Sequence, residues 1–419
     1  MTLATWSGTH VFTAPRFIEA TAVDKVRAII DTERAAGGRV RALGTRHSFH
    51  DIADTTGTLV SVTGIPAEPV LDADGRTVNV GAGIRYGELA LWLEERGWAL
   101  HNMGSLPHIS VGGATATGTH GSGDKLGNLS TAVRALEFIA ADGTVRTVAV
   151  GDPDFEALVV HLGAIGIVTR ITLAIEPSYD LRQDAYVGVP WSEVLDDLDG
   201  VTSSAYSVSV FARWTDETVA VIRKTRLETD VIPDLPETWR GGSSLVPPAI
   251  IATDSWTEQG GVPGPWLLRL PHFRLDGTPS AGDEIQTEYF VSRENAPAAL
   301  RAVRELGARI DPHLIVTELR TMAADHLWLS GAYERDTVAI HFTWMPQPTE
   351  VAALLPEVEA ALAPFDARPH WGKWHRFTAE RLAAVHPRLG DARDVFERID
   401  PDGMFSNAHL ERLGVRAAR

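Results

Sequence analysis

The chain has 419 residues, of which 44% are hydrophobic and 22% charged, and its formal net charge is −17. This length exceeds what one hydrophobic core usually supports, and the composition is typical of globular proteins, so we expect two domains. The acidic charge disfavours nucleic acids and anionic membrane surfaces as partners, and the lack of cysteine excludes disulfides, thiolate nucleophiles and Cys-ligated metals.

No apolar run approaches the roughly 20 residues that cross a bilayer. The first residues, MTLATWSGTH, lack the basic start and apolar core of a signal peptide. We therefore expect a soluble cytoplasmic protein with no membrane partner.

Short helices and strands alternate over residues 1–176, which predicts an α+β fold for this part. Val26, Ile29 and Ile30 recur at helical spacing and predict a helix over residues 16–35. The pair Asp142-Gly143, typical of a hairpin turn, joins two strands expected within residues 135–150. Further strands are predicted at residues 39–43, 77–83 and 167–177, and further helices at residues 86–97 and 155–166.

The pattern changes after Pro177. Residues 226–282 are rich in Pro, Gly and Trp and have little periodicity, which predicts irregular loops around a binding site. After them, strands are expected at residues 284–291, 314–322 and 337–345, followed by a helix at residues 350–365.

Residues 101–123, HNMGSLPHISVGGATATGTHGSG, carry five glycines between Gly112 and Gly123 among small hydroxyl residues. Such a segment lets backbone N–H groups approach phosphate oxygens closely. It matches neither a P-loop nor the Gly-x-Gly-x-x-Gly turn of a Rossmann fold, and a flexible surface loop is the alternative. His101, His108 and His120 have no zinc-motif spacing, so we expect no metal.

Two predicted strands carry polar residues at every second position. Glu318 and Arg320 share one face, and so do His341 and Thr343, while Lys373 follows shortly after. If the strands are neighbours, these groups form a polar patch suited to a polyhydroxylated ligand. A solvent-facing sheet with a surface ion pair is the alternative.

Six motifs occur in a fixed order along the chain: RALGTRHSF, the glycine-rich stretch, ELRT, HFTW, RPHWGK and DPDGMFSN. In this combination the chain resembles the flavin oxidases of the vanillyl-alcohol-oxidase type, in the branch with the sugar-lactone oxidases. The resemblance implies a two-domain fold of the PCMH type. An FAD-binding domain over residues 1–176, completed by residues 376–419, would accompany a mixed-sheet substrate-binding cap domain over residues 177–375.

In that family the histidine of the first motif is joined covalently to the 8α-methyl group of FAD, which here is His47. A single histidyl link is the covalent attachment that the resemblance allows, because the second, cysteinyl link of some members needs a cysteine that this chain lacks. The resemblance further implies that FAD contacts Gly44, Thr45, Arg46, Ser48, Ser105, Ser110, Gly113, Ala114, Thr117, Gly118, Thr119, Val168 and His370.

By the same resemblance, the substrate would bind Ser105, Glu318, Arg320, Thr343 and Lys373, with His341, Lys373, Arg320 and Glu318 taking part in catalysis. Removing the proton of an alcohol requires a base and nearby positive charge. His341 or Lys373 could be that base, and the sequence leaves the choice open. Family members have alanine before the substrate serine, whereas this chain has Gly104, so we expect open access for O2 to the flavin.

The function implied is the FAD-dependent oxidation of the terminal primary hydroxyl of alditols such as xylitol and sorbitol, by a monomer that reduces O2 to H2O2. An aldonolactone oxidase or dehydrogenase of the same family is the alternative. A sugar-binding protein without catalysis is a second alternative, which would need neither His47 nor the glycine-rich stretch.

Overall fold

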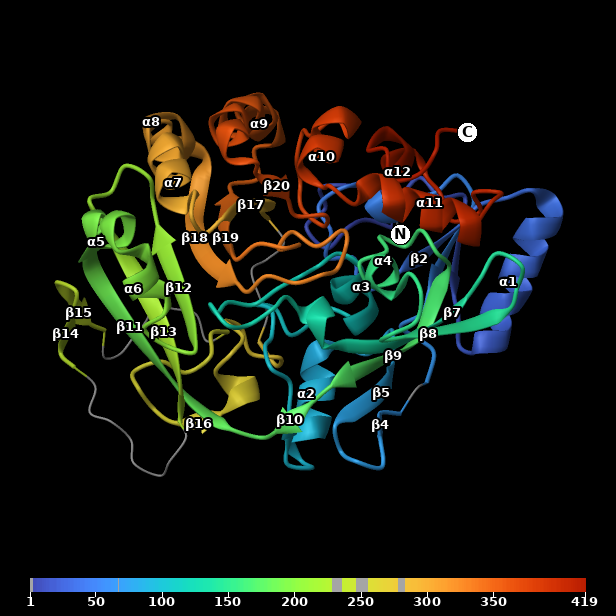
Figure 1. Ribbon diagram of the computed structural model, residues 1–419, viewed down its shortest axis with the longest axis horizontal. Helices are drawn as coiled ribbons and strands as arrows, with labels where there is room; N and C mark the ends of the chain where they lie inside the picture. Colours follow the sequence, from blue (N-terminus) through green and yellow to red (C-terminus); the bar gives the residue numbers. More distant parts are fainter. Residues whose placement is uncertain (1–2, 67, 228–235, 246–254, 278–282) are drawn as a thin grey trace.

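The computed structural model describes residues 3–66, 68–227, 236–245, 255–277 and 283–419. Figure 1 shows its two parts side by side: the large sheet of the middle of the chain on the left, and the smaller sheets of the N-terminal part on the right. The C-terminal helices lie above the N-terminal part (Figure 1).

A three-stranded parallel sheet opens the chain, in the order β1 (Arg16–Glu19), β3 (Thr58–Ser61) and β2 (Val40–Leu43). Helix α1 (Val23–Ala36) buries Val26, Ile29 and Ile30, as predicted, and ends at Gly37 in a left-handed conformation. The prediction that the helix begins at residue 16 is wrong, because residues 16–19 pair with β3 some forty residues later, and such a distant partner leaves no local periodicity.

A five-stranded antiparallel sheet follows, and its strands in order are β4 (Val70–Leu71), β5 (Thr77–Gly81), β9 (Ile167–Ala174), β7 (Val133–Ile139) and β8 (Val145–Ala149). The predicted hairpin is confirmed as β7 and β8, with Gly143 at a φ of 79° in the turn. Next to this sheet lie the helices α2 (Tyr86–Glu94), α3 (Val111–Ala116) and α4 (Phe155–Val159). Helix α4 is shorter than predicted, since Leu162 and Gly163 take positive φ values that no helix accommodates.

Ten strands of the middle part form one sheet with antiparallel pairs. Its order is β14 (Thr238–Trp239), β15 (Gly242–Ser244), β11 (Asp180–Pro190), β13 (Thr218–Leu227), β12 (Ser207–Ala212), β18 (Leu314–Met322), β19 (Thr337–Trp344), β17 (Ile285–Ser292) and β20 (Arg368–Pro369), with β16 (Gly264–Pro265) paired to β11. Its helices are α5 (Trp191–Asp196), α6 (Leu198–Thr202), α7 (Ala296–Arg304), α8 (Gly307–Ile310) and α9 (Pro348–Leu362).

The three late strands appear where the alternation of polar and apolar residues predicts them, and β19 lies between β18 and β17. Glu318 is therefore opposite His341, and His341 is opposite Glu288. The prediction of irregular loops over residues 226–282 is wrong in part, because β13 ends within this stretch and β14, β15 and β16 are short strands of the sheet. Residues 228–235, 246–254 and 278–282 of this stretch lie outside the described residues.

The C-terminal helices α10 (Ala379–Val385), α11 (Leu389–Ile399) and α12 (Ala408–Arg412) return to the N-terminal part. The Val40 N–H donates to the Met404 carbonyl oxygen at 2.9 Å. Arg416, which is 1% exposed, donates to the Ala164 carbonyl oxygen at 2.9 Å and to Asp400 Oδ2 at 3.0 Å. Both chain ends thus share one core, which supports the proposed domain made from residues 1–176 and 376–419.

Replacing Arg416 with methionine is expected to lower the free energy of unfolding by about 3–5 kcal/mol, because the Asp400 carboxylate stays buried without its partner. Denaturant titration of the purified holoprotein measures this loss. The control is Arg398→Met, which removes an exposed ion pair with Asp154 and should cost no more than about 1 kcal/mol. Equal losses for the two variants would contradict the prediction.

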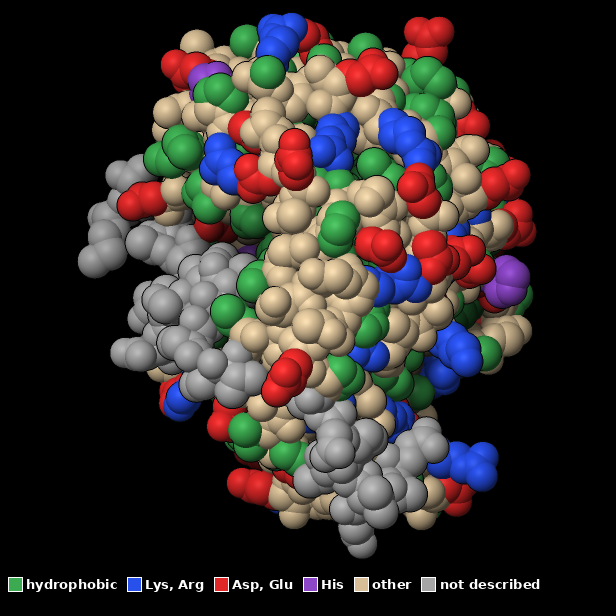
Figure 2. Space-filling view, turned by 90° about the vertical axis from the view of Figure 1, so that its left-hand side faces the viewer, with side chains coloured by type: hydrophobic (Ala, Val, Ile, Leu, Met, Phe, Trp, Pro, Cys, Tyr) green, Lys and Arg blue, Asp and Glu red, His purple; other side chains and the backbone are tan. Residues whose placement is uncertain are grey.

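On the face shown in Figure 2, acidic and basic side chains intermingle and gather into no single-sign stripe over the described residues. Within the described part of the chain, none of the helices combines the length and apolar character that crossing a bilayer requires.

Candidate active site

A cavity of about 670 Å³ runs between the N-terminal part and the large sheet. Its N-terminal end is lined by the loop at residues 41–53, the glycine-rich segment at residues 104–120 and the turn at residues 161–168. Its other end is lined by side chains of β17, β18 and β19 and by residues 370–373. The structure therefore joins the two sets of residues that the sequence singles out.

Most of the predicted cofactor-contacting residues line the cavity. These are Gly44, Thr45, Arg46, His47, Ser48, Ser105, Ser110, Gly113, Ala114, Thr117, Thr119, Val168 and His370, and Gly104 lies among them. Gly118 is not one of the lining residues; its φ of 65° instead turns the chain after α3.

The glycine-rich segment packs tightly against the first loop. The Ser110 N–H donates to Thr45 Oγ1 at 3.0 Å, and a Cβ atom at Gly44 would come within 2.5 Å of Ser110 Oγ. Ser110 is 2% exposed. The alternative of a flexible surface loop is therefore wrong: two loops distant in sequence form a close-packed, glycine-lined end of the cavity.

His47 lies on the cavity wall with its ring stacked on Trp6, at 5.3 Å between ring centroids. Its Nδ1 lies 3.1 Å from Thr45 Oγ1. Arg46 takes a φ of 66°, a strained conformation for a non-glycine residue that fixes the turn before the imidazole. Burial, with smaller electrostatic contributions from the neighbouring His108, Arg46 and Arg85, lowers the pKa of His47 to about 4, so the ring is neutral at physiological pH. A neutral imidazole has the lone pair that a covalent bond to FAD requires.

At the other end, Glu318, Arg320 and His341 converge on the cavity and are only 5–6% exposed. Arg320 Nε lies 3.5 Å from Glu318 Oε1, and Arg320 Nη1 donates to Ser105 Oγ at 3.2 Å. The alternative of a solvent-facing sheet is wrong, because the N-terminal part covers this face. Burial raises the pKa of Glu318, but Arg320 and His272 outweigh it and hold that pKa well below its usual range.

The sequence analysis missed Glu288, which lies at the centre of the polar wall and is 1% exposed. Its carboxylate is 2.8 Å from Lys373 Nζ, 3.2 Å from His120 Nε2 and 3.4 Å from Arg320 Nη2. Burial raises its pKa, but Lys373 and His120 outweigh it and keep the carboxylate ionised. The alternation of Glu284, Gln286 and Glu288 along β17 is the signal that could have revealed it.

His341 and Lys373 form a hydrogen-bonded pair beside Glu288. Lys373 Nζ lies 2.6 Å from His341 Nδ1, and His341 Nε2 lies 3.0 Å from Thr343 Oγ1. Burial and the Lys373 charge lower the pKa of His341 to about 4, and burial lowers the pKa of Lys373 against the opposing effect of Glu288. The pair thus couples a neutral imidazole to an amine that loses its proton more readily than usual.

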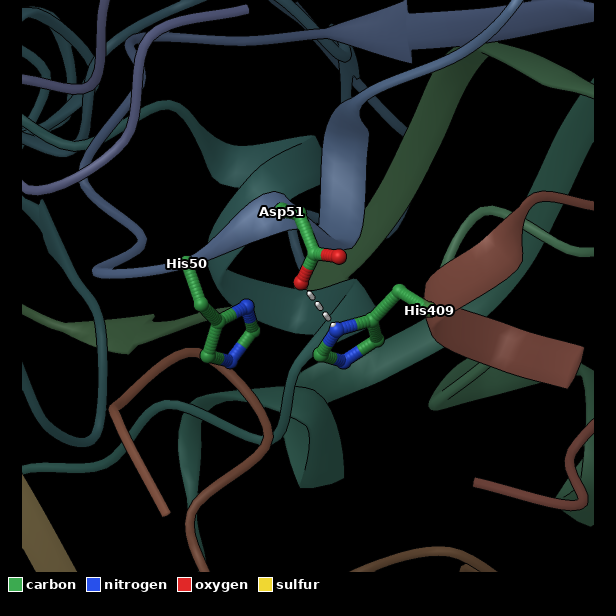
Figure 3. Close-up of side chains that lie close together, drawn as sticks. All are labelled: His50, Asp51 and His409. Carbon is green, nitrogen blue, oxygen red and sulfur yellow. Dashed lines mark hydrogen bonds and ion pairs between the residues drawn. The ribbon is translucent and has the colours of Figure 1, made fainter. Parts of the chain in front are cut away.

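Figure 3 shows another cluster, formed by His50, Asp51 and His409. The Asp51 carboxylate contacts His409 Nδ1 at 2.6 Å and Arg412 at 3.1 Å, while His50 Nδ1 accepts the Ile52 N–H at 3.2 Å. The carboxylate is already neutralised, and one His50 nitrogen is already occupied. The cluster therefore joins α12 to the start of the chain.

His101, His108 and His120 do not converge. Each ring lies within hydrogen-bonding distance of a different backbone carbonyl: those of Gly127, Leu275 and Gly121, respectively. Among the described residues, His120 instead lies close to Glu288 and His370, whose side chains could share an ion with it.

Comparison with known proteins places these features in a family. Residues 14–149 match the model of the FAD-binding domain, and residues 283–413 match that of D-arabinono-1,4-lactone oxidase. Alditol oxidase from a Streptomyces species is 40% identical over 97% of this chain and 98% of its own length. L-gulono-1,4-lactone dehydrogenase of Mycobacterium tuberculosis is 30% identical over 97% of this chain and 98% of its length.

The fold also matches solved structures. Cholesterol oxidase from B. sterolicum superposes with a TM-score of 0.80 at 15% identity, over 98% of this chain and 96% of that chain. At this identity the match concerns the fold alone. The relatives that match over nearly their whole length, together with the match to the FAD-binding domain, assign the family. The chain belongs to the FAD-dependent oxidoreductases of the vanillyl-alcohol-oxidase type, in the branch that includes alditol oxidase and the sugar-lactone oxidases.

Proposed function

We propose that this enzyme oxidises the terminal primary hydroxyl of alditols such as xylitol and sorbitol to the aldose, and that O2 takes up the electrons to give H2O2. The observation that carries the proposal is the buried polar wall, in which Glu318, Arg320 and Ser105 present acceptors and donors beside the His341–Lys373 pair. The greater identity with alditol oxidase than with the lactone-oxidising relatives supports a polyol over a lactone.

The N-terminal end of the cavity fits FAD. The glycine-lined loops at residues 44–48 and 110–119 leave room for a dinucleotide. The backbone N–H groups of these loops can donate hydrogen bonds to a pyrophosphate. We propose that His47 forms the covalent 8α-histidyl bond, since its buried neutral ring lines this end. When bound, FAD supplies the two-electron acceptor for the alcohol.

The polar wall would bind and activate the alcohol. The hydroxyl proton would leave to the His341–Lys373 pair, whose two nitrogens share one hydrogen bond. Arg320 stabilises the developing negative charge on the substrate oxygen, and Glu288 fixes Lys373. Ser105, Thr343 and Glu318 would hydrogen-bond hydroxyls farther along the polyol.

The test is the visible spectrum of the purified protein in an anaerobic cuvette, before and after xylitol. A flavin band that bleaches with xylitol is the expected result. A band that persists with xylitol but bleaches with L-gulono-1,4-lactone would replace the polyol with a lactone. A colourless protein that binds polyols, both as purified and after incubation with FAD, would favour the non-catalytic sugar-binding alternative.

We propose that Gly104 leaves space for O2 beside the flavin. A Cβ atom there would meet Ile109 at 3.5 Å and His120 at 3.7 Å, which are ordinary contacts, so alanine fits without strain. Gly104→Ala is expected to slow the reaction of the reduced enzyme with O2 by about tenfold, the effect of a barrier increase of about 1.4 kcal/mol. Stopped-flow mixing with O2 measures it, with Gly390→Ala, an open position on α11, as the control. An unchanged rate of flavin reoxidation in Gly104→Ala would contradict the proposal that Gly104 leaves space for O2.

The division into an FAD-binding domain and a cap domain, a monomeric state and a cytoplasmic location stay predictions. Size-exclusion chromatography with light scattering tests the monomer directly.

A further inference from the structure

A buried lysine lies behind the polar wall and has no role in the mechanism above. Lys224 of β13 is 2% exposed and does not line the cavity. Its Nζ donates to the Leu270 carbonyl oxygen and lies 3.3 Å from His272 Nδ1. The chain has only four lysines, so burying a second one beside the site that already holds Lys373 calls for a reason beyond packing.

His272 connects Lys224 to the cavity. Since the ionised Glu318 carboxylate only accepts, His272 Nε2 carries the proton that it donates to Glu318 Oε1 at 2.7 Å, and Nδ1 is left to accept from Lys224 Nζ. The ring stacks on Trp256, at 5.4 Å and 21°, and meets the edge of Phe211 at 5.4 Å. The imidazole is thus fixed both by its hydrogen bonds and by the aromatic rings around it.

The charges around this chain of contacts are arranged to favour an anionic Glu318. Arg320 lies 3.5 Å from Glu318 Oε1, and His341 on β19 also faces the carboxylate. Burial and Lys224 lower the pKa of His272 to about 4, so the ring relays a hydrogen bond and carries no charge of its own. With Oε1 held by His272, Oε2 is the oxygen left for a ligand in the cavity.

We propose that Lys224 and His272 are positioning residues that aim the Glu318 carboxylate at the substrate and thereby set the affinity for a polyol hydroxyl. The proposal rests on the proposed function of this site. A carboxylate oxygen held in place accepts a hydroxyl proton strongly, and a substrate without that hydroxyl would leave it unpaired. The expected effect is therefore on substrate binding rather than on the transfer of electrons to the flavin.

The first test is Lys224→Met in the holoenzyme, which removes the hydrogen-bonding amine but keeps a long unbranched side chain. The KM for xylitol is expected to rise about tenfold, the loss of one charge-assisted hydrogen bond, while kcat changes less than about twofold. The control is Arg223→Met, which removes the neighbouring charge on β13, where the side chain instead bonds Ser204. A fall in kcat with an unchanged KM would overturn the proposal.

The second test asks whether Lys224 acts through His272. His272→Phe breaks both links and keeps a ring between Trp256 and Phe211. In this background Lys224→Met is expected to change KM by less than about twofold, because the pathway is already cut. Independent effects that multiply would show that Lys224 acts by another route and would overturn the proposal.

A stability control distinguishes misfolding from loss of the positioning role. The Tm of each variant is compared with that of the wild type, and Lys224→Gln replaces Lys224→Met if the latter does not fold. If xylitol fails to bleach the wild-type flavin, the proposed function fails. If xylitol bleaches the wild type and the Lys224 variants keep its KM, the positioning role fails alone.

Discussion

Lys373→Met is expected to slow the reduction of the bound flavin by xylitol about a thousandfold, the largest effect on rate that this structure predicts. Lys373 Nζ contacts both His341 and Glu288, at 2.6 Å and 2.8 Å. The substitution removes the amine from the pair that takes the alcohol proton. It also leaves the Glu288 carboxylate buried beside the site without its nearest cation, which opposes negative charge on the substrate oxygen.

Anaerobic stopped-flow mixing with xylitol gives the limiting rate of flavin bleaching and so separates this loss from a change in substrate affinity. Lys125→Met is the matched control, because Lys125 is exposed. We also expect the dependence of the limiting rate on pH to flatten in Lys373→Met, since the variant lacks one of the two coupled groups. A variant that reduces its flavin within tenfold of the wild-type rate would remove Lys373 from the proposed mechanism.

His47→Ala is expected to release essentially all of the flavin when the protein is denatured in acid, whereas the wild type keeps its yellow colour in the precipitate. His47 lies on the cavity wall with a neutral ring, and the chain has no cysteine that could form a second link. The folded variant should still bind FAD without a covalent bond, because the glycine-lined loops remain.

The absorbance of the supernatant and of the pellet after acid precipitation measures this result. His313→Ala is the control, since His313 contacts Gln347 on the other part of the molecule and should leave the flavin attached. Retention of flavin by the denatured His47→Ala protein would place the covalent bond at another residue. Release of flavin from the denatured wild type would show that this chain binds FAD without a covalent bond.

The sequence determined the features that depend on local periodicity and on residue type. The alternation along residues 314–322 and 337–345 places Glu318 with Arg320 and His341 with Thr343, and the structure confirms both pairs on β18 and β19. The resemblance carried by the ordered motifs predicted the family and the fold, which the comparisons confirm. These features can be predicted from the sequence because each depends on residues close together in the chain or on sequence motifs.

Only the tertiary structure decided what covers each face and which distant groups meet. Periodicity shows that Glu318 and Arg320 lie on the same side of a strand. A solvent-exposed surface and a buried site have the same sequence pattern, however, and only the burial of these residues under the N-terminal part distinguishes the two. The central place of Glu288 and the contact of Lys224 with Glu318 through His272 join segments from 32 residues (Glu288 and Arg320) to 168 residues (His120 and Glu288) apart. Strand β1 escaped prediction for the same reason, since its partner β3 lies far along the chain and long-range pairing leaves no local signal.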